Sequence, residues 1–227
     1  MVQQVLQRFG FTYSSPQSTP LPTGHSLSAL PSDESVEPSG PYPELVGCLI
    51  TSGMELVLGG RDRPVLTGYS DASWADDQAT QRSSQGYTFS LGSGSVSWRS
   101  TRSSSVPSSS CEAEIYATAM AAQGLRWLTY LLTDLGEQPR SPPVLYVDNK
   151  ATIAFCGEHR LEHRTKHIAL RYFLARELQQ RGQLCLRYVA TRANTADVFT
   201  KALQPCDHQR FCTVLGLVPT VPHLLTS

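Results

Sequence analysis

Residues 144–156 read Val-Leu-Tyr-Val-Asp-Asn-Lys-Ala-Thr-Ile-Ala-Phe-Cys, and this stretch decides the fold. The run up to Asp148 is short and apolar, which predicts a buried strand of the parallel type. The residues that follow, Asn149–Cys156, predict a helix. A strand that leads directly into a helix indicates a sheet with helices packed on it.

The flanking segments complete one domain around this unit. Before it we expect three strands and a long helix: Val65–Asp71, Gly86–Leu91, Ser95–Ser100 and about Cys111–Leu135. Ser110 is expected to cap that helix and Gly136 to end it. After it we expect a helix, a strand and a last helix: about Thr165–Arg181, Leu184–Val189 and Asn194–Leu203. The order βββαβααβα predicts an α/β fold with a mixed five-stranded sheet flanked by helices.

Composition divides the chain into three parts. Prolines are frequent between Phe11 and Pro43, and this stretch has no Lys or Arg, so residues 1–60 are predicted to be disordered or partly helical. Residues 61–204 hold the predicted sheet and its helices. Residues 205–227 are predicted to be a C-terminal tail.

Bulk properties exclude several classes of protein. The formal net charge is zero, so the chain as a whole is not a generic polyanion binder. The six cysteines include no CxxC pair, and there is neither a secretory signal nor a long apolar run. We therefore expect reduced thiols in a cytoplasmic or nuclear protein without membrane contact.

Residues 159–192 are locally basic, with eight Lys or Arg side chains against Glu162 and Glu177. Such a run is either a solvated helix face or a patch that follows a phosphate backbone. His159, His163 and His167 in the same stretch have a spacing that could bind zinc on one helix face. The surrounding basic side chains oppose a cation there, so we favour phosphate or sugar contacts.

Four acids fall where this fold presents ligands: Asp71 in the first strand, Glu114 in the first turns of the long helix, Asp148 at the end of the fourth strand and Asp197 in the last helix. Alone, an aspartate at a strand end is more often a turn former, and Glu114 or Asp197 could each be a charge at a helix start. Four clustered carboxylates would repel one another unless cations lay between them. Oxygen ligands favour Mg²⁺ or Mn²⁺, and two such ions suit phosphoryl displacement.

Seven short motifs follow one another between about residues 68 and 218. They are YSDASW (69–74), RSSQGY (82–87), VSW (96–98), SSCEAE (109–114), YVDNK (146–150), HRTKHI (163–168) and ADVFTKAL (196–203). This ordered set resembles the RNase H domain of copia-type retrotransposon polyproteins, and seven ordered motifs make a chance match implausible. The resemblance implies an RNase H-like fold.

The resemblance also implies an activity. A ribonuclease H cuts the RNA strand of an RNA/DNA hybrid with two Mg²⁺ or Mn²⁺ ions, held here by the catalytic acids Asp71, Glu114, Asp148 and Asp197. Glu114 is preferred over Glu112, because Ala117 follows it by three residues as the superfamily pattern requires. The two side chains lie about 200° apart on a helix, so Glu112 is expected to be a charge at the helix start.

Further residues are assigned to the nucleic acid: Asn149, Arg164, Lys166, His167 and Arg171. No His lies between Tyr188 and Asp197, so no histidine is given a catalytic role. Asp76 and Asp77 in the run Trp-Ala-Asp-Asp imitate a polymerase signature, but they directly follow the first acidic strand and are expected to be turn residues.

The segment before residue 60 resembles the far end of a copia-type reverse transcriptase, with an internal deletion. The resemblance implies a truncated polyprotein piece without polymerase activity, which would act beside a separate reverse transcriptase. The alternative is a catalytically inactive nucleic-acid-binding remnant, or a decayed polyprotein fragment.

Overall fold

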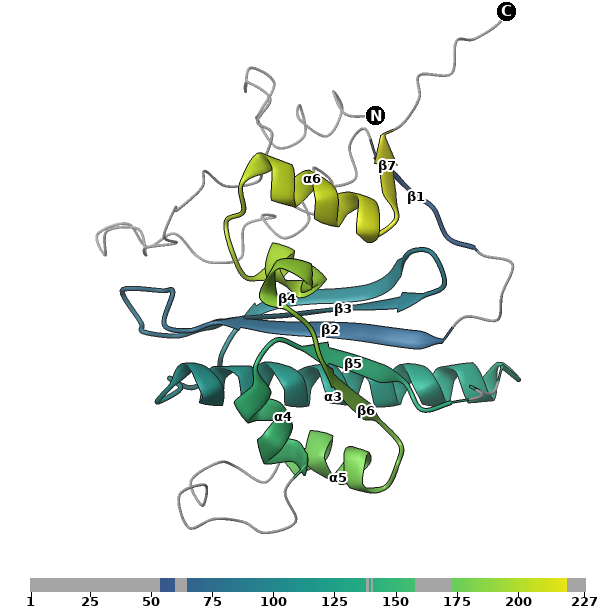
Figure 1. Ribbon diagram of the computed structural model, residues 1–227, viewed down its shortest axis with the longest axis horizontal. Coiled ribbons are helices and arrows are strands. Elements are labelled where there is room, and N and C mark those ends of the chain that lie inside the picture. Colours follow the sequence, from purple (N-terminus) through teal and green to yellow (C-terminus); the bar gives the residue numbers. More distant parts are fainter. Residues whose placement is uncertain (1–53, 60–64, 138, 140, 158–172, 220–227) are drawn as a thin grey trace, which may run out of the picture.

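The computed structural model describes residues 54–59, 65–137, 139, 141–157 and 173–219, arranged around one mixed sheet (Figure 1). The sheet has five strands in the order β4-β3-β2-β5-β6. They are β2 (Leu66–Ser73), β3 (Ser84–Leu91), β4 (Ser95–Arg102), β5 (Val144–Val147) and β6 (Cys185–Tyr188). The β2, β3 and β4 strands are antiparallel neighbours, whereas β5 and β6 continue the sheet in parallel from β2. This arrangement confirms the predicted fold class.

Helices lie on both faces of the sheet. One face is covered by α3 (Ser110–Asp134), α4 (Lys150–Gly157) and α5 (Leu174–Gln180). On the other lie two 3₁₀ helices, η3 (Thr191–Ala193) and η4 (Thr195–Phe199), and then α6 (Pro205–Val214). A separate two-stranded sheet pairs β1 (Met54–Leu56) with β7 (Leu217–Pro219) in antiparallel fashion. The domain is therefore layered, with the central sheet between two groups of helices.

Small residues bring α3 close to the sheet. Ala113, Ala117 and Ala121 on α3 are fully buried, and Ala113 and Ala117 cluster with Ala72 of β2. Farther along, the buried Phe89 ring fills the space beside Gly68 and Gly124, where an added Cβ would come within 2.8 and 2.6 Å of it. Burying one large apolar side chain such as Phe89 contributes about 1.5–3 kcal/mol, so this contact helps to hold α3 on the sheet.

The ends of α3 follow the expected chemistry, with a shift of one residue at the start. Ser109 rather than Ser110 is the N-cap: its backbone is extended and its hydroxyl accepts a hydrogen bond from the Glu112 N–H. Ser110 already has helical geometry as the first residue of α3. Gly136 follows the helix at φ +81°, a conformation that favours glycine, and ends it as predicted.

Two expectations near the C-terminus were wrong. The predicted helix over Asn194–Leu203 is only the 3₁₀ segment Thr195–Phe199, because the Asn194 side chain caps it and Thr200 turns toward Asp71 instead of continuing it. The stretch after Gln204 is not only a tail. Pro205 starts α6, and Gly216 at φ +85° turns the chain into β7.

Other expectations have different outcomes. Residues 54–56, which were expected to be disordered or helical, form β1 because β7 supplies a hydrogen-bonding partner. The helix expected over Thr165–Arg181 is described only as α5, since 158–172 lie outside the described residues. The thiols of Cys111, Cys156, Cys185, Cys206 and Cys212 are free. Within the described ranges, every helix is too short or too polar to cross a bilayer.

Gly86 of β3 is one of the points at which η4 packs tightly on the sheet, and it supports a prediction. An added Cβ would lie 2.8 Å from the Phe199 Cβ and 2.9 Å from the Thr200 Cγ2. We expect Gly86→Ala to lower the free energy of unfolding by about 1–3 kcal/mol, because overpacking displaces η4. Urea denaturation monitored by circular dichroism measures this change.

Gly157→Ala is the matched control. Gly157 ends α4, and an added Cβ would meet only the Gln179 Nε2 at 3.9 Å. This variant should keep or slightly raise the stability. Equal stabilities for Gly86→Ala and Gly157→Ala would contradict the tight packing of η4.

Candidate metal centre

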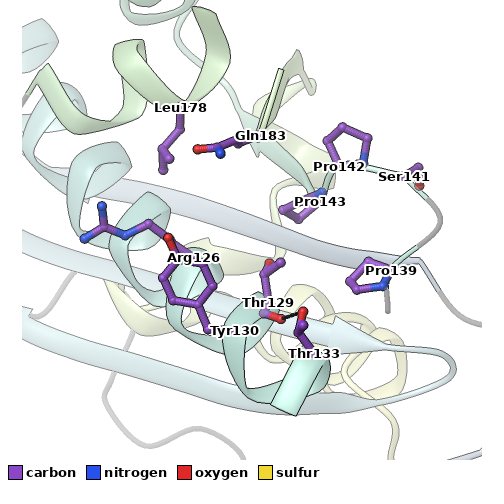
Figure 2. A pocket seen from close by; sticks show the side chains of 10 residues that line it. All are labelled: Arg126, Thr129, Tyr130, Thr133, Pro139, Ser141, Pro142, Pro143, Leu178 and Gln183. Carbon is purple, nitrogen blue, oxygen red and sulfur yellow. Dashed lines mark hydrogen bonds between the residues drawn. The ribbon is translucent and has the colours of Figure 1, made fainter. Parts of the chain in front are cut away.

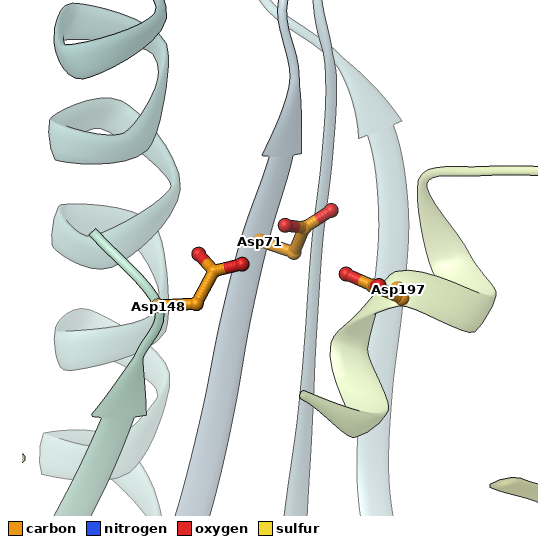
Figure 3. A group of neighbouring side chains, drawn as sticks. All are labelled: Asp71, Asp148 and Asp197. Atoms are coloured by element: carbon orange, nitrogen blue, oxygen red, sulfur yellow. The ribbon is translucent and has the colours of Figure 1, made fainter. Parts of the chain in front are cut away.

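Three aspartates from separate elements meet at one edge of the sheet. Asp71 lies in β2, Asp148 follows the last residue of β5, and Asp197 lies in η4, with one carboxylate oxygen of each within 4.8 Å of the others. Figure 3 shows the three carboxyl groups pointing toward one another, with Asp71 between the other two. The parallel pairing of Ser70 with Val147 places the first two acids side by side.

The third aspartate is held in place by a buried amide. Asn194 is fully buried, and its Nδ2 donates a hydrogen bond to the Ser70 carbonyl at 2.9 Å. Its Oδ1 accepts from the Ala196 N–H at 3.2 Å, which caps η4. From the other side, the Ser100 hydroxyl donates to the Phe199 carbonyl at 2.6 Å. Asp197 is therefore fixed relative to the sheet by hydrogen bonds between side chains and backbone at both ends of η4, to β2 at one end and to β4 at the other.

Glu114 lies at the border of the aspartate cluster. Its Oε1 accepts a hydrogen bond from the Ala72 N–H at 3.4 Å, while its Oε2 is buried without a partner among the described residues. Burial raises the pKa of Glu114 to about 9, and repulsion by Asp71 and Asp148 contributes. The structure thus brings all four predicted acids into one neighbourhood, with Glu114 as a carboxyl group that retains its proton at neutral pH in the absence of a cation.

Two of the aspartates also have raised pKa values. Burial raises the pKa of Asp197 to about 7, with repulsion by Asp71 as the next cause. Burial also raises the pKa of Asp148, in part against a hydrogen bond from the Thr191 side chain. Clustered carboxylates that resist ionisation are the expected electrostatic signature of a site that needs a cation.

Sequence reasoning missed two groups that contact the aspartates. The Lys201 Nζ lies 3.1 Å from the Asp71 Oδ1 and 2.9 Å from the Asp197 Oδ1. The Thr200 hydroxyl donates to the other oxygen of Asp71. Both residues belong to the last sequence motif, which was the available signal, but a motif does not show toward which carboxylate a side chain points.

Glu112 has the structural role expected for it. Its Oε2 accepts hydrogen bonds from the Ser108 N–H at 2.7 Å and the Ser108 hydroxyl at 2.5 Å, and the Tyr116 hydroxyl donates to its Oε1. The side chain therefore ties the start of α3 to the preceding turn. Glu114 is the glutamate that faces the aspartates.

The other predicted contact residues are placed only in part. Arg164, Lys166, His167 and Arg171 lie outside the described residues, as does the histidine set considered for zinc. Asn149 follows Asp148, and its Oδ1 accepts from the Thr152 N–H at 3.1 Å at the start of α4. Its assigned contact with nucleic acid stays a prediction.

Asp76 and Asp77 stabilise a turn, as the sequence predicts. Asp76 accepts hydrogen bonds from the N–H and the hydroxyl of Ser84, each at 2.7 Å, and pairs with Arg102 at 2.8 Å. Asp77 accepts from the Thr80 hydroxyl at 2.6 Å. Both carboxylates are thus engaged in local structure.

A hollow lies beside the C-terminal half of α3, away from Glu114 in the first turns of that helix, between α3, α5 and the segment before β5 (Figure 2). Its volume is about 430 Å³. The described side chains that line it are Arg126, Thr129, Tyr130, Thr133, Pro139, Ser141, Pro142, Pro143, Leu178 and Gln183. None of these ten is acidic, so they offer no carboxylate to a metal.

The donor set at the aspartate cluster fits hard divalent cations. Its ligands are carboxylate oxygens, and the buried Oε2 of Glu114 is an acceptor without a partner among the described residues. Burial, followed by repulsion from neighbouring aspartates, raises the pKa of Glu114 and Asp197, so these carboxylates are stabilised when a proton or a cation reduces their charge. Asp71, Asp148, Asp197 and Glu114 are therefore the residues able to hold such ions.

The sequence of the chain is similar to part of several transposon polyproteins. The retrovirus-related Pol polyprotein from transposon RE2 of Arabidopsis thaliana is 38% identical over 157 residues, which are 69% of this chain and 11% of that polyprotein. That from transposon TNT 1-94 of Nicotiana tabacum is 29% identical over an alignment of 248 positions, covering 89% of this chain and 18% of the polyprotein. The chain thus spans less than a fifth of the length of these relatives. No protein-family profile matches it.

Solved structures show similar arrangements at low identity. The N-terminal RNase H domain of a Mycobacterium tuberculosis protein superposes with a TM-score of 0.45 and 13% identity, covering 65% of this chain and 98% of that one. The foamy viral protease-reverse transcriptase in complex with an RNA/DNA hybrid gives 0.46 and 12%, covering 68% and 22%. Together with the predicted motifs, the polyprotein matches establish the relationship. The chain is homologous to one segment of the retrovirus-related Pol polyproteins of plant transposons.

Proposed function

We propose that this chain is a ribonuclease H that hydrolyses the RNA strand of an RNA/DNA hybrid with the help of divalent cations. The observation that carries the proposal is the convergence of Asp71, Asp148 and Asp197 from three elements, with Glu114 beside them. The homologous polyproteins support it, since the match to the transposon TNT 1-94 polyprotein takes in 89% of this chain and so includes these acids.

Asp71, Asp148, Asp197 and Glu114 would hold the ions, which we propose to be two Mg²⁺ or Mn²⁺. When bound, such ions stabilise the negative charge of the attacking and leaving oxygens in a phosphoryl displacement. The fold contributes rigidity: Asn194 fixes η4, and the β2–β5 pairing fixes the other two aspartates. Preorganised ligands of this kind do not have to be rearranged when the substrate binds.

The proposed substrate is a hybrid because the RNA strand carries 2′-hydroxyls that distinguish it from DNA. Asn149, next to Asp148, and the basic residues Arg164, Lys166, His167 and Arg171 are proposed to contact the sugar-phosphate backbone. A separate reverse transcriptase is the proposed partner, and the cytoplasm or the nucleus the proposed location, since hybrids arise where RNA is copied into DNA.

A second candidate is a protein that binds hybrids without cutting them. The observation that favours it is the ion pairing of Lys201 with Asp71 and Asp197, which supplies a cation from the chain itself. The two candidates differ in one measurable property, metal-dependent cleavage.

The cleavage prediction uses the full chain and a hybrid labelled on each strand. We expect the RNA strand alone to be cut in Mg²⁺ or Mn²⁺ and the reaction to stop in EDTA. Asp148→Asn should lower the rate by at least about 100-fold, because a neutral amide is a weaker ligand for a hard cation. Denaturing electrophoresis of the products measures the rate.

Asp134→Asn is the control for this experiment, because it makes the same substitution at an exposed position at the end of α3. Its rate should equal that of the wild type. A folded, metal-saturated protein that binds the hybrid but leaves the RNA intact would establish the second candidate instead.

The protonation of Glu114 gives a prediction for the metal-free protein. In the unfolded chain its pKa is near 4.5, whereas in the fold it is about 9, so between these values the folded state holds a proton that the unfolded state has lost. Stability must therefore fall as the pH rises through this window. Glu114→Gln has no carboxyl group at this position and so lacks this pH dependence. In EDTA, the free energy of unfolding of Glu114→Gln minus that of the wild type should therefore increase by up to about 1.4 kcal/mol for each unit by which the pH is raised.

Urea titrations at pH 5, 7 and 9 measure this difference. Glu137→Gln, at an exposed position just after α3, is the matched control and should differ from the wild type by the same amount at each pH. A pH-independent difference for Glu114→Gln would show that Glu114 is ionised in the fold.

A further inference from the structure

Lys201 occupies the space between two of the proposed metal ligands. Its ammonium group lies 3.1 Å from the Asp71 Oδ1 and 2.9 Å from the Asp197 Oδ1. The chain turns back at this point, because the Lys201 N–H donates to the Asp197 carbonyl at 2.9 Å. The ammonium is therefore bound to both carboxylates by the local fold, not by a chance surface contact.

The contacts of Lys201 divide the acidic cluster into two halves. On one side, Asp71 and Asp197 share the ammonium. On the other side, Asp148 and Glu114 are attracted by the charge of Lys201 but form no ion pair with it in the described part of the chain, and the buried Oε2 of Glu114 lacks a hydrogen-bond partner there.

We propose that Lys201 is a positioning residue that sets the order of metal binding. It holds Asp71 and Asp197 together in the metal-free protein and leaves them when a divalent ion binds between them. An ion on the Asp148 and Glu114 side meets no such competitor and binds first. This inference rests on the proposed function, since it assumes that the cluster binds divalent ions.

The physical reason is that the ammonium and a divalent ion compete for the same two carboxylate oxygens, the Oδ1 atoms of Asp71 and Asp197. A divalent ion binds oxygen at about 2.0–2.2 Å, so an ion on the Oδ1 atoms would lie within a few ångströms of the ammonium and repel it. Lys201 can leave, because its side chain is one-third exposed and has a flexible four-carbon stem. The ion that binds second must therefore displace the lysine.

Mn²⁺ binding to the full chain tests the inference without measuring catalysis. Electron paramagnetic resonance of free Mn²⁺ gives the affinities of the wild type, Lys201→Gln and Arg181→Gln. We expect Lys201→Gln to bind the weaker ion at least about tenfold more tightly, with a smaller change for the stronger ion. Arg181→Gln is the matched control, because it removes a positive charge from an exposed pair with Glu177 and should leave both affinities unchanged.

A second measurement on the wild type does not depend on the folding of a variant. The lysines of the chain are Lys150, Lys166 and Lys201, and mass spectrometry gives the acetylation rate of each with acetic anhydride. Saturating Mn²⁺ should raise the rate at Lys201 several-fold, because the ammonium is released from its two carboxylates. Lys150, whose ammonium lies 5.0 Å from the centre of the Tyr188 ring, is the internal reference.

The outcomes separate the two proposals. If Mn²⁺ binds at the cluster but leaves the acetylation rate of Lys201 unchanged, the inference is overturned and the proposed function stands. If the wild type and Lys201→Gln bind no Mn²⁺, the metal site and the inference both fail. Faster acetylation of Lys201 in Mn²⁺ supports the displacement, even if Lys201→Gln does not fold.

Discussion

Repulsion among buried carboxylates is the constraint on which the site depends. The β2–β5 pairing brings Asp71 next to Asp148, and Asn194 brings Asp197 to the same place, so the fold forces like charges together. Such an arrangement is stable only if protons or cations reduce the charge. In the described structure, a proton on Glu114 and the ammonium of Lys201 have this role. The same repulsion among the carboxylates therefore affects both the stability of the metal-free domain and its affinity for metal.

Much of the fold could be predicted because its signals are local. The apolar run at 144–147 and the long periodic segment after Ser109 each determine their own conformation, and glycine at 136 ends the helix for a steric reason. The choice of Glu114 over Glu112 came from the resemblance, whose pattern has a small residue three positions after the glutamate, and helix geometry added only that the two side chains face different directions. Their contacts agree with it: Glu112 binds Ser108 and Glu114 binds Ala72.

The rest depends on contacts between residues far apart in the sequence. Met54–Leu56 forms a strand only because residues more than 160 positions later pair with it, and nothing in the local sequence indicates this. The segment after Asn194 has a helical pattern, yet Thr200 and Lys201 turn toward Asp71, more than 120 positions earlier. A motif can show that Lys201 accompanies Asp197, but only the folded chain shows that it bridges two carboxylates.

The β1–β7 pairing has a consequence for how the domain can be joined to other segments. Met54 lies opposite Pro219, so a polypeptide that enters at the first strand and leaves at the last passes through one point on the surface. A domain attached in this way can be inserted into a longer chain, or lost from it, without separating the segments on either side.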